Sequence, residues 1–200
     1  MDDLAQRFVQ DALRNPCNRL LLEGLPELDL PDAWLVGGCL FQAVWNLRAG
    51  QLPEAGVRDY DIFYFDPTDL SEVAENAINQ RARRAFGDLG IEIEVKNQAR
   101  VHTWYPRYFG RPCPPLQSAC EGVDRFLVGS TSVGMQQARG QTTVYAPYGL
   151  ADLYAGLLRA NPRVDHGSLY QQKARDYQAR WTWLRMPETA GNHLQTGDQG

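Results

Sequence analysis

Val57-Arg-Asp-Tyr-Asp-Ile-Phe-Tyr-Phe-Asp66 is the stretch of the sequence around which the rest of the chain is arranged. From Tyr60 to Phe65 every residue except Asp61 is aromatic or β-branched, a composition typical of a β-strand. The two-residue period of a strand places Asp59 and Asp61 on one face, with Cα atoms roughly 7 Å apart. Their carboxylates can therefore converge on one point above the sheet.

Two carboxylates that converge need a partner for their charge. Ionised carboxylates about 4 Å apart repel by about 4 kcal/mol at an effective dielectric constant of about 20. The pair therefore requires a divalent cation, a shared proton or open water. Solvated residues where a strand begins are the more common explanation of an Asp-x-Asp pair taken alone, so the flanking sequence has to decide.

The segment before the acidic strand combines a short strand, two glycines and a helix. Residues 33–36 predict a buried strand, Gly37 and Gly38 follow, and residues 39–48 have the composition of a helix closed by Gly50. Glycines at a helix start allow close backbone approach and leave free N–H groups, which suits a phosphate. A tight turn that needs glycine for its conformation is the alternative.

The segment after the acidic strand supplies further acids. Residues 70–89 carry a helical stripe of apolar side chains, and residues 91–96 then alternate strictly between apolar and charged ones. Glu92, Glu94 and Lys96 share the polar face of this second strand. Either glutamate could join the two aspartates in a two-metal site, and periodicity does not choose between them. Magnesium suits such oxygen ligands together with substrate phosphates.

Basic and aromatic residues near these motifs have two explanations each. Arg58 could pair with Asp59 or with substrate. Lys173, on the final predicted helix, could reach phosphates or belong to a solvated face. Lys96 could line a nucleotide pocket or end a polar strand. Aromatic residues within 104–108 could stack a base, but such clusters are usually core, and we assign them to the core.

The composition predicts one globular domain with helical additions. The chain has 200 residues, of which 44% are hydrophobic and 22% charged, enough for a sizeable core. We expect a single domain over residues 1–186, with a core at about 30–146, N-terminal helices within 1–25 and C-terminal helices within 148–184, followed by a flexible tail over 187–200.

Residue counts argue against several kinds of site. Four cysteines without a Cys-x-x-Cys pair and only three histidines argue against zinc and for reduced thiols. We find neither a membrane span nor a secretory signal, and we expect a cytoplasmic protein with no membrane partner. The net charge of −4 argues against a nucleic-acid partner and favours small substrates.

Three blocks of sequence resemble a known family, namely Trp-Leu-Val-Gly-Gly-Cys-Leu-Phe-Gln-Ala-Val-Trp-Asn (34–46), Asp-Tyr-Asp-Ile-Phe-Tyr-Phe-Asp (59–66) and Glu-Val-Lys-Asn-Gln-Ala-Arg-Val-His-Thr-Trp-Tyr (94–105). The chain is similar to small bacterial nucleotidyltransferase-like proteins of the polymerase-beta superfamily over about residues 30–184. The superfamily motif, a hydrophobic residue, two small residues and a later Asp-x-Asp, maps onto Val36-Gly37-Gly38 and Asp59-x-Asp61. Cys39 stands where the superfamily commonly has Ser or a charged group.

This resemblance implies an α+β fold in which a mixed or antiparallel sheet is flanked by helices. It implies a magnesium-dependent transfer of a nucleoside monophosphate group from a nucleoside triphosphate to an unknown acceptor hydroxyl. A catalytically silent nucleotide-binding or protein-interaction module of the same fold is the alternative. The resemblance favours Glu94 as the third acid, because it opens the third block.

The expected site combines catalytic and nucleotide-binding residues. Asp59, Asp61 and Glu94 are expected to be catalytic and to bind two Mg²⁺ ions, with Mn²⁺ as a substitute. The residues expected to bind the nucleotide are Gly37, Gly38, Arg58, Lys96 and Lys173.

Overall fold

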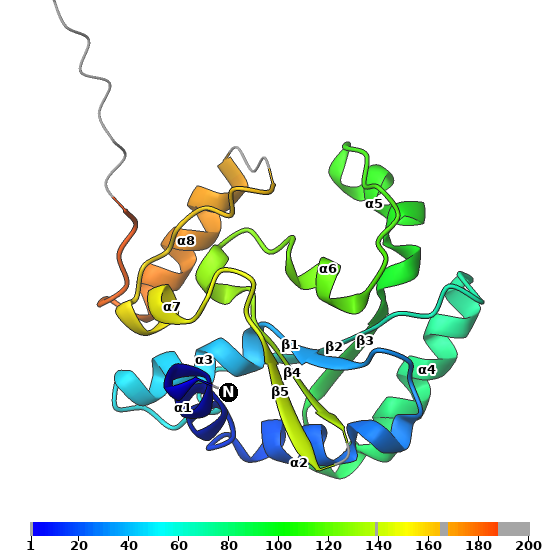
Figure 1. The fold of residues 1–200 in the computed structure, drawn as a ribbon, viewed down its shortest axis with the longest axis horizontal. Coiled ribbons are helices and arrows are strands. Elements are labelled where there is room, and N and C mark those ends of the chain that lie inside the picture. Colours follow the sequence, from blue (N-terminus) through cyan, green and yellow to red (C-terminus); the bar gives the residue numbers. More distant parts are fainter. Residues whose placement is uncertain (1, 139, 165–167, 188–200) are drawn as a thin grey trace, which may run out of the picture.

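The computed structural model describes residues 2–138, 140–164 and 168–187, and a five-stranded sheet forms its centre (Figure 1). The strands are β1 (Trp34–Val36), β2 (Asp59–Tyr64), β3 (Glu92–Asn97), β4 (Gly134–Ala138) and β5 (Gln141–Tyr145). They lie in the order β3-β2-β1-β4-β5, with β2 and β3 parallel and the other neighbours antiparallel. The prediction of a mixed sheet is thus confirmed.

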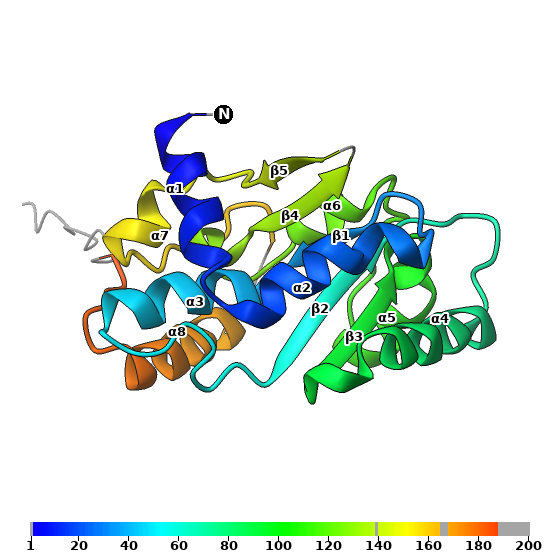
Figure 2. The same ribbon diagram turned by 90° about the horizontal axis from the view of Figure 1, so that it is seen from below.

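Helices flank this sheet, so the fold class is α+β. The α-helices are α1 (Asp3–Ala12), α2 (Pro16–Gly24), α3 (Gly38–Arg48), α4 (Glu72–Ala85), α5 (Val101–Phe109), α6 (Ala119–Val123), α7 (Ala151–Ala155) and α8 (Ser168–Arg180). Short 3₁₀ helices span Leu25–Leu28, Gly87–Leu89, Gln98–Arg100 and Gly129–Thr131. Figure 1 shows α5, α6 and α8 above β1 and β2, whereas Figure 2 shows α1 and α2 in front of the sheet's other side.

Capping residues fix where the first two helices begin. The Asp2 side chain accepts a hydrogen bond of 2.7 Å from the Ala5 backbone N–H, which leaves one fewer unsatisfied donor at the start of α1. The Asn15 side chain accepts from the Cys17 N–H at 3.0 Å, and Pro16 occupies the first position of α2, where its missing N–H costs nothing. The two helices predicted within residues 1–25 are present.

Strand β2 has one buried and one polar face. Tyr60, Ile62 and Tyr64 are at most 2% exposed and belong to the main core beneath the sheet. Asp59 and Asp61 alternate with them and lie on the opposite face, as the two-residue period predicts. The sheet therefore lifts both acids to the side on which α5, α6 and α8 lie.

Helix α4 covers the outer edge of β3. The Asn79 amide accepts from the Val95 N–H at 2.8 Å and donates to the Val95 carbonyl at 2.7 Å, so one side chain replaces a missing neighbouring strand. A buried ion pair of 2.6 Å joins Glu75 of α4 to Arg100 after β3. This edge is closed, and β3 is held in position beside β2.

Helix α8 joins the core through aromatic packing on α3. The Trp45 ring lies edge to face against Tyr177 and Trp181, with centroids 5.4 and 5.2 Å apart, and is tilted on Phe41 at 4.7 Å. The Trp181 indole N–H also donates to the Asn46 side chain at 2.9 Å. These contacts fix the last turn of α8, and Trp181 directly after it, against α3.

Some expectations need correction. Residues 97–108, whose pattern was hard to assign, form a 3₁₀ turn and most of α5. Tyr108 is 75% exposed, so its assignment to the core was wrong. The tail predicted for 187–200 lies outside the described residues from 188 onward.

Within the described part of the chain, none of the helices combines the length and apolarity needed to cross a membrane.

Candidate active site

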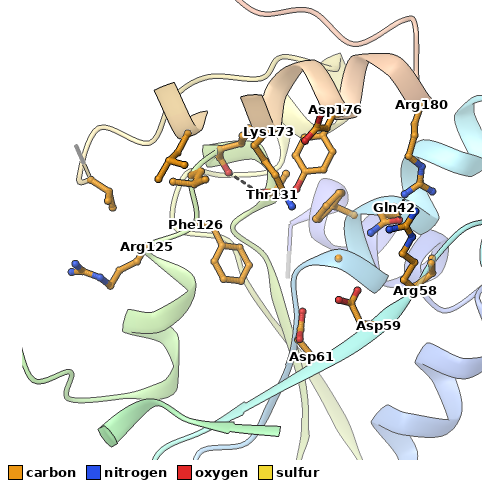
Figure 3. Close-up of a pocket in the computed structure, with 18 of the residues that line it drawn as sticks. Gln42, Arg58, Asp59, Asp61, Arg125, Phe126, Thr131, Lys173, Asp176 and Arg180 are labelled. Carbon is orange, nitrogen blue, oxygen red and sulfur yellow. Dashed lines mark hydrogen bonds between the residues drawn. The ribbon is translucent and has the colours of Figure 1, made fainter. Parts of the chain in front are cut away.

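A cleft of about 1230 Å³ opens above the polar face of β2. The segment leading into β2, the start of α3 and the helix α8 line one side, and α5 with the loop after α6 lines the other. Figure 1 shows α8 and α5 rising on opposite sides above the sheet. Asp59 and Asp61 lie at the floor, where the two sides meet (Figure 3).

The carboxyl group of Asp61 has a raised pKa. Burial raises its pKa to about 7, and the neighbouring charges of Asp59 and Glu94 act in the same direction. The charges of Lys96 and Lys173 oppose this rise in the pKa. A carboxyl group held in this way loses its proton readily when a cation arrives. The donor set of two converging carboxylates thus fits a divalent metal ion.

The start of α3 lies directly beside Asp59. A Cβ atom placed on Gly38 would lie 3.9 Å from the Asp59 Oδ1 and 3.2 Å from the Gln42 Nε2. No side chain caps α3, so the positive end of its dipole is turned toward this space. An anionic group above Gly38 would meet backbone donors, the Gln42 amide and the acids together.

Cationic side chains surround the same space. Arg180 donates from Nη1 to the Gln42 Oε1 at 2.7 Å and from Nη2 to the Ala55 carbonyl at 3.2 Å. Burial and the neighbouring Arg58 lower the pKa of Arg180. Figure 3 shows Arg58, Gln42 and Arg180 together on one side of Asp59, with Lys173 reaching down from α8. The cationic side chains at this end of the cleft would attract a negatively charged group.

Five of the residues expected from the sequence line the cleft, and three do not. The lining residues are Gly38, Arg58, Asp59, Asp61 and Lys173. Gly37 donates its N–H to the Val133 carbonyl at 2.9 Å, and the Phe126 ring lies only 2.8 Å from where its Cβ would be. Lys96 pairs with Glu94 at 2.8 Å in a small hollow beside α4. As ligands of substrate or metal, all eight remain predictions.

The two candidate third acids are distinguished by register. Glu94 lies opposite Asp61 in the parallel pair, and Glu92 lies opposite Asp59. Only Glu94 is near enough to raise the pKa of Asp61 noticeably. Among the described residues no three acidic, histidine or cysteine side chains are gathered as a metal site, because the half-exposed Glu94 side chain is turned to Lys96. A rotation of that side chain is needed to complete the set.

Sequence reasoning missed several residues of the cleft. Gln42 lies one helical turn after Gly38, and this spacing alone could have placed it beside the phosphate cradle. Phe126 and Arg125 carry no local signal, because the chain brings them to β2 from more than sixty residues away. Cys39 is fully buried, and burial raises the pKa of its thiol well above the ordinary value. Its side chain therefore lies outside the cleft.

Comparisons with known proteins agree with this architecture. A family model described as Nucleotidyltransferase matches residues 23–186. A solved structure described as "The NMR structure of the protein reveals a CCA-adding enzyme head domain" is similar, with 25% sequence identity and a TM-score of 0.75. The likeness covers 92% of this chain and 96% of that chain. Among proteins of curated function, none matches the sequence significantly.

Proposed function

The chain belongs to this nucleotidyltransferase family, and from that premise we propose that it transfers a nucleoside monophosphate group from a nucleoside triphosphate to an acceptor hydroxyl. Pyrophosphate would be the second product. The observation that carries the proposal is the position of Asp59 and Asp61 beside the uncapped start of α3, at the floor of a cationic cleft. The likeness to a head domain described as that of a CCA-adding enzyme supports the same class of reaction.

The end of the cleft near α3 would bind the triphosphate. The N–H groups at Gly38 and the Gln42 amide would donate to phosphate oxygens, and Arg58 and Lys173 would balance their charge. Arg180 holds the Gln42 oxygen, which leaves the amide nitrogen toward Gly38. Much of the catalysis would come from this positioning, because phosphoryl chemistry depends chiefly on alignment and charge neutralisation.

The acids at the floor of the cleft would bind the metal ions. Asp59, Asp61 and Glu94 would hold two Mg²⁺ ions, or Mn²⁺ in their place, and such ions stabilise the attacking and leaving oxygens of an in-line displacement. Asp61 keeps a proton up to about pH 7 in the ligand-free protein. Its deprotonation would accompany loading of the site, so binding of the triphosphate with metal releases a proton near neutral pH.

A second candidate follows from the position of Glu94. Its carboxylate pairs with Lys96 at 2.8 Å instead of meeting Asp59 and Asp61. A chain that keeps this pairing with substrate bound would be a catalytically silent nucleotide-binding module. The two candidates differ in one measurable property, the number of acids that ligate the metal.

Paramagnetic broadening of amide resonances tests both candidates. The protein would be labelled with ¹⁵N and titrated with Mn²⁺ in the presence of an α,β-methylene nucleoside triphosphate. Broadening around β2 that is absent in Asp61→Asn, and that needs more Mn²⁺ in Glu94→Gln than in the unmodified protein, supports the enzyme, because Glu94 lies beside Asp61 and its own broadening would not prove ligation. Broadening that needs the same Mn²⁺ concentration in Glu94→Gln favours the silent module. Absence of any effect near β2 contradicts both.

A further inference from the structure

The end of the cleft opposite Arg180 has a different chemistry from the floor. Among the described residues, Arg125 lines it together with the flat rings of Tyr105 and Phe109. The acidic residues in the described part of the lining, Asp59, Asp61 and Asp176, lie on β2 and α8. In Figure 3, Arg125 lies on the side of Phe126 that faces away from Asp59 and Arg58. This far end is thus basic and aromatic.

The aromatic residues at the far end present an exposed stack on α5. Tyr105 and Phe109 lie 4.5 Å apart between centroids with planes tilted by 35°, and Trp104 supports both at 6.1 and 6.5 Å. Phe109 is 51% exposed although it lines the cleft. Exposed flat rings at the rim of a cleft offer a face on which a planar group can stack.

The backbone around Arg125 is held firmly, and its guanidinium contacts the Tyr105 ring but lacks a hydrogen-bond partner for Nε among the described residues. The Asn161 amide, itself 2% exposed, donates to the carbonyls of Asp124 and Phe126 at 2.6 and 2.8 Å, so the backbone on both sides of Arg125 is fixed. The Arg125 guanidinium carbon lies 5.8 Å from the Tyr105 ring centroid. Its buried Nε has no hydrogen-bond partner among the described residues. A rigid loop therefore presents a guanidinium that is available to donate hydrogen bonds to a ligand.

Reaction geometry assigns a role to this end. In an in-line displacement, the attacking and leaving oxygens lie on opposite sides of the phosphorus. In the proposed reaction, the start of α3 together with Arg58 and Arg180 binds the phosphates that leave as pyrophosphate. The acceptor must then approach from the opposite side, past Phe126, where Arg125 and the α5 rings lie.

We propose that the far end binds the acceptor, and that the acceptor carries a nucleoside phosphate unit. This inference rests on the proposed function. The base of the acceptor would stack on Phe109 and Tyr105, and its phosphate would accept hydrogen bonds from Arg125. The acceptor hydroxyl oxygen bonds to the α-phosphorus of the triphosphate as the bond from that phosphorus to the α,β-bridging oxygen breaks. The hydroxyl proton passes to solvent water, and pyrophosphate leaves.

A nucleoside phosphate unit can come from two sources. A free mononucleotide and the end of a single-stranded RNA present the same ring and the same anion to the cleft. They differ in how binding responds to salt, because each further phosphate of an RNA that is neutralised releases counterions. A test with both ligands therefore identifies the source.

The experiment first fills the α3 end with Mg²⁺ and an α,β-methylene nucleoside triphosphate, and then titrates the far end by calorimetry. The probes are the four nucleoside 5′-monophosphates, ribose 5-phosphate and a six-nucleotide single-stranded RNA. For whichever probe binds, Arg125→Gln should lower the affinity by about tenfold, the size expected for loss of a charge-assisted hydrogen bond. Phe109→Leu should weaken it by about fivefold or more through lost stacking.

Matched controls lie on the same helix. Arg107→Gln and Tyr108→Leu change residues of α5 that do not line the cleft, and both should leave probe binding unchanged. None of the four variants should alter the affinity for the triphosphate. Thermal midpoints that agree with the unmodified protein exclude a folding defect as the cause.

The outcomes separate this inference from the proposed function. Binding of a monophosphate, or of the RNA alone with a salt slope, supports the inference when Arg125→Gln weakens it. Absence of binding by every probe, no effect of Arg125→Gln, or equal affinity for ribose 5-phosphate overturns it. If the triphosphate itself fails to bind with Mg²⁺, the proposed function has failed instead. Monophosphate binding at the far end should survive in Asp61→Asn, which lacks the metal site.

Discussion

Arg180 donates a hydrogen bond of 2.7 Å from Nη1 to the Oε1 of Gln42, and this contact joins the last turn of α8 to the first turns of α3. Because the Gln42 oxygen is occupied by Arg180, its amide nitrogen lies toward Gly38, 3.2 Å from the position of a Cβ there. A residue of the C-terminal helix therefore orients a donor at the proposed phosphate site. Helix α8 thus contributes to the proposed phosphate site as well as to the core.

Gln42→Glu should separate these two roles of Gln42. The carboxylate keeps a partner for Arg180 and the same size, but it replaces an N–H donor by an anion beside Asp59. We expect affinity for a triphosphate with Mg²⁺ to fall about tenfold or more, since a hydrogen bond to a charged group contributes about 1.5–3 kcal/mol. Gln171→Glu, an exposed change on α8 at a residue that does not line the cleft, is the matched control for calorimetry. Unchanged affinity in Gln42→Glu would contradict the role of the amide.

Asp61→Asn should stabilise the ligand-free protein at alkaline pH. Because the pKa of Asp61 is raised to about 7, the folded state keeps a proton that the unfolded chain loses near 3.8. Stability is then highest at acidic pH and declines as the pH rises toward and through about 7. Each pKa unit corresponds to about 1.4 kcal/mol, so we expect the midpoint at pH 8.5 to rise by at least about 4 °C in Asp61→Asn.

Thermal unfolding midpoints of the metal-free proteins, measured from about pH 5.5 to about pH 8.5, test this expected difference. Asp88→Asn, on an exposed turn far from the cleft, is the control and should follow the unmodified protein. Parallel pH profiles for the unmodified protein and Asp61→Asn would show that Asp61 is not perturbed. Added Mg²⁺ should remove most of the difference, because the cation compensates the repulsion between the two aspartates.

Glu94→Gln and Glu92→Gln should differ in their effect on metal binding. Glu94 faces Asp61 across the parallel pair, and Glu92 faces Asp59 nearer the end of the strand. We expect Glu94→Gln to reduce Mg²⁺-dependent affinity for the triphosphate by about tenfold, by loss of a charged ligand. Glu92→Gln should change it by less than about twofold. The reverse order would make Glu92 the third acid.

Gly37→Ala should destabilise the fold more than Gly50→Ala does. Both glycines have positive φ angles, 65° and 70°, so both changes strain the backbone by about 1–2 kcal/mol. Only the Cβ at Gly37 would meet a neighbour, the Phe126 ring at 2.8 Å, whereas nothing lies within 4 Å at Gly50. We expect an additional loss of about 1–3 kcal/mol in urea unfolding. Equal losses would mean that Phe126 does not press on Gly37.

Local patterns in the sequence were sufficient for most of the sheet and its acids. The alternation around Asp61 and around Glu94 fixes which side chains share a face, and period alone carries that information. The glycines before α3 mark a strand-to-helix turn in the same way. These features depend on neighbours within a few residues, which is why sequence patterns expose them.

Long-range features of the cleft could not be predicted in this way. The Gln42 contact to Arg180 joins residues 138 positions apart, and the loop that carries Arg125 into the cleft is held by the distant Asn161. Helix α5 was hard to assign because its aromatic and polar residues follow no clear period and include Pro106. The side chain of Glu94 turns to Lys96, a choice that strand period cannot reveal.

The most direct test of the central claim is a calorimetric titration of an α,β-methylene nucleoside triphosphate into the protein with and without Mg²⁺. The account predicts binding that requires Mg²⁺, is lost in Asp61→Asn, and survives in Asp176→Asn, which changes another acid of the same cleft. Equal binding with and without Mg²⁺, or none in either condition, would contradict it.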